Sequence, residues 1–152
     1  MHYREACLND LPVLLALEQY IIETERPLDP LLKSEGARYY DLEALITHTD
    51  SVVMVAEEND EIIATGYAKI CQSEPWYAHD YHTYLGFMYV AEQYRGQGLN
   101  QDMMTILKDW SQNKGIHHLY LEVYTDKAHA IRAYEKAGFT PHVLEMRLNL
   151  DD

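Results

Sequence analysis

Hydrophobic positions in the N-terminal half recur with a helical period in one segment and a strand period in another. After a short strand, a stripe at helical spacing predicts a helix that starts beyond residue 10. Its members are Leu11, Leu14, Leu15 and Ile22. The segment "SVVMVAEENDEIIATGYAKI", residues 51–70, holds two β-rich runs around the polar turn "EEND" and predicts a hairpin. Between them, the sequence predicts a loop over residues 24–36 and a short helix over 37–48.

Predicted strands and helices also alternate in the C-terminal half. The run "TYLGFMYV", residues 83–90, and the run at 117–125 predict strands, and residues 126–138 predict a helix. A second helical stripe ends near a glycine that fits a helix cap. It consists of Leu99, Met103, Ile106, Leu107 and Trp110, followed by Gly115. Residues 139–150, "FTPHVLEMRLNL", predict one or two closing strands. Helices interspersed among strands imply an α/β fold with helices on the faces of a central sheet.

Length and composition limit the kind of protein. The 152 residues correspond to about one domain, and without repeats or linkers the sequence predicts a single domain over residues 1–152. No run of about 18 apolar residues is present, so a membrane is not an expected partner. The N-terminal stretch "MHYREACLND" is too polar for a signal peptide. Cys7 and Cys71 fit free thiols better than a disulfide framework, which predicts a cytoplasmic protein.

The net charge of the chain limits the classes of molecule that are expected to bind it. The sequence has 25 acidic and 12 basic residues and a formal net charge of −13. Nucleic acid is not an expected partner, because phosphate binding needs clustered Lys and Arg. A cationic substrate would be drawn toward such a field. The same charge can also serve solubility alone, and both interpretations stay open at this point.

A glycine-containing turn, "YRGQG" at residues 94–98, joins a predicted strand to a predicted helix. The first N–H groups of a helix have no internal partner, and the helix dipole adds positive character there, so phosphate fits at this end. Gly96 and Gly98 allow positive φ and close approach of a ligand, and Arg95 adds a cationic fork. The spacing by itself is compatible with a plain turn or with an anion-binding turn.

Two other diphosphate-binding loops do not match this turn. A nucleoside-triphosphate loop needs G-x-x-x-x-G-K-[ST], and no Lys-Ser or Lys-Thr follows here. A dinucleotide fingerprint needs a third glycine near a first strand. Gln101 stands at the third position, and the turn comes after about 90 residues.

Two motifs make the chain similar to the GNAT superfamily of acyl-CoA-dependent N-acyltransferases. The stretch "VAEQYRGQGLN", residues 90–100, resembles the phosphate-loop pattern of that family, and "KAHAIRAYEKAGF", residues 127–139, resembles its second signature helix. The resemblance covers nearly the whole chain and implies a mixed central sheet, splayed between two parallel strands, with helices on both faces. Asn100 stands where Gly or Ala is usual, and Lys127 stands where Asn is frequent.

The resemblance implies a binding site for acetyl-CoA where strands 83–90 and 117–124 separate, with Gly86 at a bulge. Backbone groups of Met88 and Val90 are then expected to pair with the pantetheine amides, and an N–H near Met88 or Tyr89 to polarise the thioester carbonyl. The residues expected to contact the cofactor are Met88, Tyr89, Val90, Arg95, Gly96, Gln97, Gly98, Leu99, Asn100, Lys127, Ala130 and Tyr134.

The resemblance also implies direct transfer of an acetyl group to an amine, and therefore an acyltransferase. Tyr134 matches the family tyrosine near the departing sulfur and is the expected general acid. Asp80 and His82 are the candidate general bases, with Glu74, His79 and Glu122 as further carboxylates and imidazoles. His79 and His82 alone are too few for a metal site, so no metal is expected.

Several alternatives stay open on sequence alone. The expected acceptor is the amine of a small molecule or of a protein, cationic in character, and the choice between monomer and homodimer is undecided. A non-catalytic acyl-CoA-binding module or sensor of the same fold would retain the glycine turn. An ordinary α/β domain could use that turn for another anion.

Overall fold

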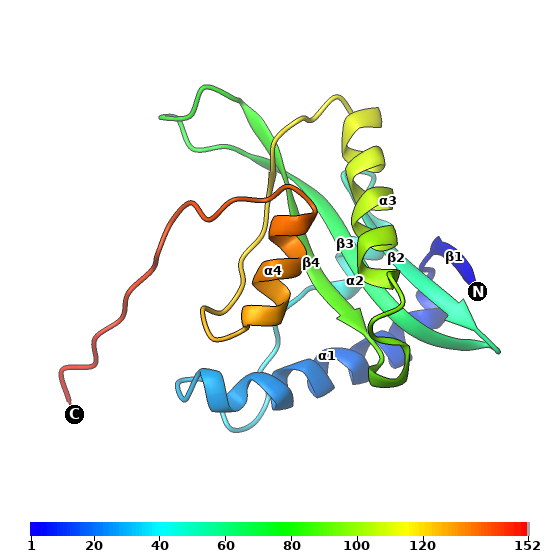
Figure 1. Cartoon of the computed structure of the whole chain (residues 1–152), viewed down its shortest axis with the longest axis horizontal. Helices are drawn as coiled ribbons and strands as arrows, with labels where there is room; N and C mark the ends of the chain where they lie inside the picture. Colours follow the sequence, from blue (N-terminus) through cyan, green and yellow to red (C-terminus); the bar gives the residue numbers. More distant parts are fainter. Residues whose placement is uncertain (152) are drawn as a thin grey trace.

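The chain folds around one mixed sheet, in the computed structural model that describes residues 1–151. The strand order is β1-β2-β3-β4-β5 (Figure 1). The strands are β1 (His2–Glu5), β2 (Ser51–Glu58), β3 (Glu61–Gln72), β4 (Tyr81–Val90) and β5 (Leu119–Tyr120). The first four strands pair antiparallel, and β5 pairs parallel to β4. The mixed sheet and the parallel pair agree with the predicted fold class.

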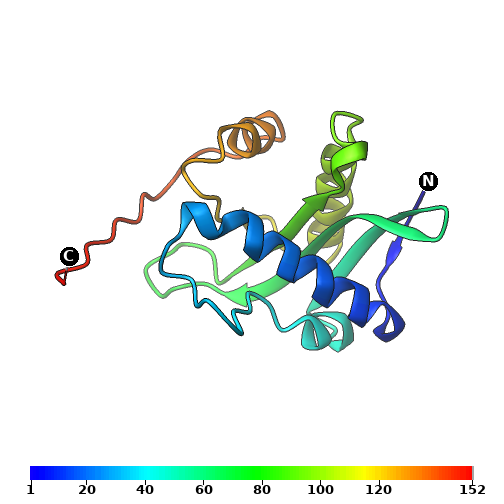
Figure 2. The ribbon, with the colours of Figure 1, turned by 90° about the horizontal axis from the view of Figure 1, so that it is seen from below.

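Helices cover both faces of this sheet (Figure 2). They are α1 (Leu11–Glu25), α2 (Leu42–Thr47), α3 (Leu99–Asn113) and α4 (Ala128–Lys136), with short 3-10 turns at Leu8–Asp10, Arg26–Leu28 and Glu92–Tyr94. One apolar cluster joins α1 and α2 to the sheet, and another joins α3 to its opposite face. None of the helices within residues 1–151 has the length and apolarity needed to cross a bilayer.

The alternation of β2 explains why two clusters form. Side chains of successive strand residues point to opposite faces. Val53 and Val55 accordingly pack with Leu14 of α1, while Val52 and Met54 pack on the face covered by α3. All four valine and methionine side chains are buried, so the sheet is apolar on both faces and needs helices on both.

Strand β4 carries a bulge in its second half. Thr65 pairs with Tyr89, and Tyr67 pairs with Gly86, so two residues of β4 oppose one residue of β3. Phe87 in the bulge has a φ of 54°, and its carbonyl accepts a hydrogen bond of 2.6 Å from the buried Thr65 hydroxyl. A side chain at Gly86 would lie 2.4 Å from the Tyr67 ring, which accounts for glycine there.

The bulge changes the outer edge of β4. Strand β5 pairs with β4 only at Thr83–Leu119 and Tyr84–Tyr120, before the bulge. Beyond that point the two chain segments separate, as the predicted splay requires. The end of β4 therefore carries backbone groups that face away from β3 without a partner strand.

Two predicted strands differ from the structure. The strand expected over residues 117–125 is reduced to Leu119–Tyr120, and residues 139–149 form no helix or strand. The closing strands were predicted over residues 139–150, where the alternating side chains of Leu144, Met146 and Leu148 are 67%, 84% and 83% exposed. An alternating segment becomes a strand only beside another strand, and this one extends away from the sheet (Figure 1).

Candidate functional site

The turn between β4 and α3 has the geometry that an anion needs. Gly96 has a φ of 79° and Gly98 a φ of 84°, and Gly98 is the N-cap residue of α3. No atom lies within 4 Å of a Cβ built on either glycine, so backbone conformation rather than crowding selects glycine here. The first helical hydrogen bond runs from the Asp102 N–H to the Gly98 carbonyl, so the N–H groups of residues 99–101 precede it.

Side chains around this turn divide between solvent and core. Arg95 and Gln97 are exposed, and the Arg95 Nε donates to the Val90 carbonyl at 3.0 Å. Leu99 is 3% exposed and packs in the α3 cluster, so it can meet a ligand at this turn only through its backbone. Asn100 is half-buried in the first turn of α3.

The end of β4 presents backbone groups toward the separated β5 segment, and one of them, the Val90 carbonyl, accepts a hydrogen bond from Arg95. The Ala91 N–H donates to the Ile63 carbonyl of β3 at 2.8 Å. Because successive residues of a strand alternate, the groups of Val90 and Met88 face the opposite edge. Tyr89 lies between them, half-buried, with its ring 6.0 Å from the ring of Tyr20 on α1. The expected pantetheine-pairing residues thus lie at the open edge.

Helix α4 brings Tyr134 to the same region. The Gln101 side chain of α3 donates to the Ala133 carbonyl at 3.0 Å, and Lys108 donates to the Ala137 carbonyl, which ties α4 to α3. Tyr134 is half-buried and packs edge-on against Phe139 at 6.2 Å. Burial, helped by the charge of Glu25, raises the pKa of Tyr134 to about 12. The phenol is therefore protonated throughout the physiological pH range.

An ion pair at the end of α1 was not predicted. Glu25, the last residue of α1, is 8% exposed, and the Lys127 ammonium donates to its carboxylate. Lys127 was expected among the cofactor-binding residues, and the structure places its ammonium on Glu25. Ala130 lies half-buried in the first turn of α4. No pattern in residues 24–36 could indicate this pair, because its members are 102 residues apart.

A second set of contacts lies beside that pair. Asp29 is 9% exposed and accepts from the Tyr124 hydroxyl at 3.0 Å and from the Arg147 guanidinium at 2.9 Å. The hydrogen bond from Arg147, helped by that from Tyr124, holds the pKa of Asp29 below its usual value, against the opposite effect of burial. Arg147 thereby ties the extended C-terminal segment to the end of α1.

The candidate bases lie at the other end of β4. The Ser73 hydroxyl lies 2.7 Å from the His79 Nδ1 and 2.9 Å from the His82 Nδ1, and the His79 Nε2 lies 2.8 Å from the Tyr120 hydroxyl. Burial, with a contribution from His79, lowers the pKa of His82. Asp80 is exposed on the β3–β4 loop. Nothing in the sequence indicated the bridging role of Ser73.

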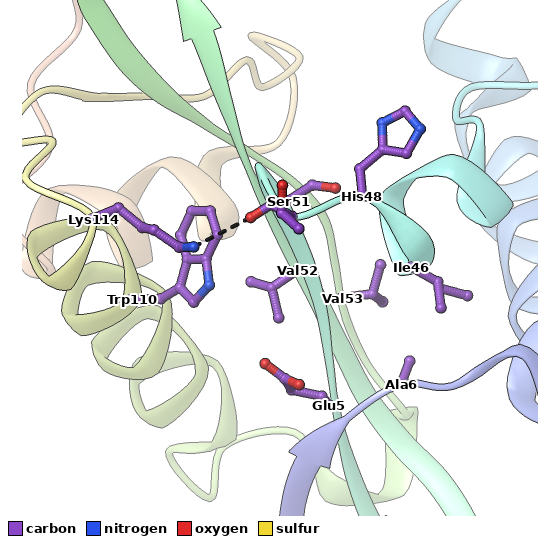
Figure 3. A pocket seen from close by; sticks show the side chains of 10 residues that line it. Glu5, Ala6, Ile46, His48, Ser51, Val52, Val53, Trp110 and Lys114 are labelled. Carbon is purple, nitrogen blue, oxygen red and sulfur yellow. Dashed lines mark hydrogen bonds between the residues drawn. The ribbon is translucent and has the colours of Figure 1, made fainter.

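Two surface cavities accompany these features. One of about 290 Å³ lies in the β3–β4 loop, lined by residues that include Ser73, His79 and Asp80. The other, of about 260 Å³, lies between β2, α2 and the end of α3, where Lys114 sits 5.6 Å from the centre of the Trp110 ring (Figure 3). With a rise of about 1.5 Å per residue, α3 separates this second cavity from the glycine turn by most of its length.

Within residues 1–151, no three His, Cys, Asp or Glu side chains are grouped to hold a metal ion.

The family profile and the sequence relatives that match this chain are all acetyltransferases. The profile of the acetyltransferase (GNAT) family matches residues 17–139. N-alpha-acetyltransferase 30 of Schizosaccharomyces pombe is 29% identical over 85 residues, which are 56% of this chain and 55% of that protein. The chain spans between 21% and 55% of the length of the curated relatives that it matches.

Solved structures share the fold over almost the whole chain. A predicted acetyltransferase from Clostridium acetobutylicum, solved with acetyl-CoA, has a TM-score of 0.77 and 23% identity, with 98% of this chain and 96% of that chain covered. An aminoglycoside N-acetyltransferase in complex with CoA has a TM-score of 0.73 and 13% identity, with 97% and 99% covered.

Proposed function

The chain belongs to the acetyltransferase (GNAT) family, and we propose that it transfers an acetyl group from acetyl-CoA directly to the amine of a cationic small molecule. The observation that carries the proposal is the pair of positive-φ glycines that open α3, next to the unpaired end of β4. This arrangement offers N–H groups to a diphosphate and strand-like groups to an extended amide chain at one edge.

The residues present fit such a cofactor. The space above Gly96 and Gly98 is open, so a diphosphate can approach the backbone closely. The outward-facing groups of Met88 and the Val90 N–H can pair with amides as an added strand would, while the Val90 carbonyl already accepts from Arg95. Arg95, which now donates its Nε to Val90, keeps its terminal nitrogens for phosphate oxygens. Acetyl-CoA supplies the acetyl group as a thioester.

Three groups of the chain would carry the chemistry. An N–H at the bulge, near Met88, would stabilise the negative charge that develops on the carbonyl oxygen. Tyr134, protonated at working pH, would donate a proton to the departing sulfur. A base must accept the proton of the attacking amine, since an alkyl amine with a pKa of about 10.4 is mostly protonated at neutral pH.

His82, rather than Asp80, is the base we propose. It lies six residues before Met88 on β4, about 20 Å away at 3.3 Å per residue, so the proton of the amine would have to reach it along a chain of waters. Its lowered pKa keeps the imidazole neutral near pH 7, so it can accept a proton. If the His82 Nδ1–H donates to Ser73, the Ser73 hydroxyl can donate to His79, and the His79 Nε2–H to Tyr120. This arrangement satisfies each hydrogen bond and leaves the His82 Nε2 free.

Removing this imidazole should alter the pH dependence of kcat/KM. His82→Gln is expected to lower kcat/KM for the acceptor by about 10²-fold at pH 7. The pKa of His82 lies below its ordinary value of about 6.5. The ratio of kcat/KM in the wild type to kcat/KM in His82→Gln should therefore stay constant from neutral pH down to the pKa of His82. It should fall at still lower pH, where the imidazole is protonated. The protonation of the acceptor amine affects both proteins equally, so it cancels in this ratio.

The exposed His117 provides the control for that measurement. His117→Gln should match the wild type at every pH. A ratio for His82→Gln that is close to one, or that does not change with pH, would exclude His82 as the base.

The proposed activity is tested by mixing the protein with acetyl-CoA and a panel of amines and following free thiol. Thiol release should depend on the amine and be fastest with cationic small molecules. Binding of acetyl-CoA without amine-dependent release would favour the non-catalytic sensor, and no binding would remove acetyl-CoA from the proposal. A peptide with a free N-terminus belongs in the panel, and its preference would identify a protein acceptor instead.

A further inference from the structure

The buried end of α1 carries a carboxylate that is already bound to an ammonium group. Glu25 is 8% exposed, and its ammonium partner comes from Lys127, the residue directly before α4. A buried charge is costly unless it is paired. The ammonium of Lys127 is chemically the same group that an alkyl amine acceptor presents. The 35% exposure of the Lys127 side chain leaves it a path to solvent.

The walls around this carboxylate are held by other contacts. Glu18, fully buried in α1, accepts from the backbone N–H groups of Tyr39 and Tyr40 at 2.8 and 2.7 Å. These bonds bring Tyr39 next to Glu25. Burial, followed by Glu25 and then Tyr124, raises the pKa of the Tyr39 hydroxyl. The Tyr39 hydroxyl is buried and lies beside both Glu25 and Tyr124, so a group that replaces Lys127 on Glu25 would also come next to it.

The second buried carboxylate nearby has a different role. Both oxygens of Asp29 are engaged, one by the Tyr124 hydroxyl and the other by Arg147. Asp29 therefore positions Tyr124 and leaves no oxygen for a ligand. Glu25 is held by Lys127 alone among its charged neighbours within the described chain.

Glu25 also lies beside the proposed acid. The Glu25 charge contributes to the raised pKa of Tyr134. Lys127 directly precedes α4, and Tyr134 lies on that helix seven residues later. An ammonium on Glu25 thus lies near the phenol.

We propose that Glu25 is the seat of an ammonium group of the acceptor that is not itself acetylated, and that Lys127 fills this seat until the acceptor replaces it. The exchange swaps one ammonium for another, so the buried carboxylate stays paired. The Tyr39 hydroxyl is then a hydrogen-bond partner for the acceptor. The seat selects alkyl amines and rejects acceptors with a carboxylate near the amine. This inference rests on the proposed acetyl transfer and names the substrate class of that site.

The test measures amine binding without turnover. The probe is 1,4-diaminobutane, titrated calorimetrically into the protein saturated with CoA, which has no acetyl group to transfer. Glu25→Gln should weaken diamine binding at least about tenfold, which is about 1.4 kcal/mol. Lys127→Met, which removes the internal competitor, should tighten it at least about threefold. 1-Butanol, the uncharged comparison, should bind equally to all variants.

Glu23 provides the matched control. It lies two residues before Glu25 on the same helix, and its side chain is 62% exposed and paired with Arg26. Glu23→Gln removes the same charge, so equal losses for Glu23→Gln and Glu25→Gln would mean that only the overall acidic field matters and would overturn the seat. Unchanged diamine affinity in Glu25→Gln, or no diamine binding to either wild type or Lys127→Met, would also overturn it.

If Glu25→Gln alone does not fold, a double variant can be tested in its place. Glu25→Gln with Lys127→Met leaves no unpaired charge, so it should fold when Glu25→Gln alone does not. It should bind the diamine at least about tenfold more weakly than Lys127→Met, and equal affinity would overturn the seat. Amine-dependent thiol release from acetyl-CoA by the wild type tests the transfer reaction separately, so thiol release without any effect of Glu25→Gln on diamine binding would overturn the seat alone.

Discussion

Tyr134→Phe is expected to lower kcat by at least about tenfold while acetyl-CoA affinity stays nearly unchanged. General acid catalysis typically contributes about 10²–10⁴-fold. The substitution removes only the hydroxyl and keeps the ring that packs against Phe139. A loss in kcat without a loss in cofactor binding would mean that the hydroxyl acts in the transition state. Steady-state kinetics with the best amine, beside a binding titration, measures both.

The pKa of Tyr134 adds a second check on this role. Since that pKa is raised to about 12, the phenol keeps its proton well into the alkaline range. Tyr134 should therefore cause no loss of activity below about pH 10. Tyr81→Phe is the control, because Tyr81 is 52% exposed at the start of β4. An unchanged kcat in Tyr134→Phe would leave water as the proton donor.

Gly98→Val is expected to lower acetyl-CoA affinity at least about tenfold, or about 1.4 kcal/mol. Two effects act together. The side chain would occupy the open space above the turn where the diphosphate is proposed to lie. It would also strain the backbone, because a φ of 84° costs a residue with a Cβ about 1–2 kcal/mol.

The opposite end of α3 separates these two effects. Gly115 has a φ of 80° and no atom within 4 Å of a built Cβ, so Gly115→Val introduces the same strain away from the turn. Both variants should lose similar thermal stability by circular dichroism. Only Gly98→Val should lose acetyl-CoA affinity in calorimetry. Equal cofactor affinities in the two folded variants would mean that "YRGQG" is a plain turn.

Local features of the fold were predicted well, because local forces decide them. The hairpin over residues 51–70 became β2 and β3, and the apolar stripe that begins at Leu11 became α1. The glycine turn was predicted because positive φ is a property of single residues. The bulge was predicted beside Gly86, where the close Tyr67 ring gives the physical reason.

Contacts between distant segments were not predicted. The closing strands failed because alternation defines two faces but not a neighbouring strand. Asp80 and His82 were chosen as bases from residue type, and the sequence did not indicate that Ser73 would bridge His79 and His82.

The sequence by itself determined the α/β class, the family and the positive-φ glycine turn before α3, since each depends on residue type at short spacing. Only the tertiary structure decided that Glu25 at the end of α1 would be buried against Lys127, 102 residues later, beside the phenol of Tyr134. An exposed Glu and a buried Glu look alike in a sequence. Their difference arises from desolvation and pairing, which exist only once helices from both halves of the chain have packed together.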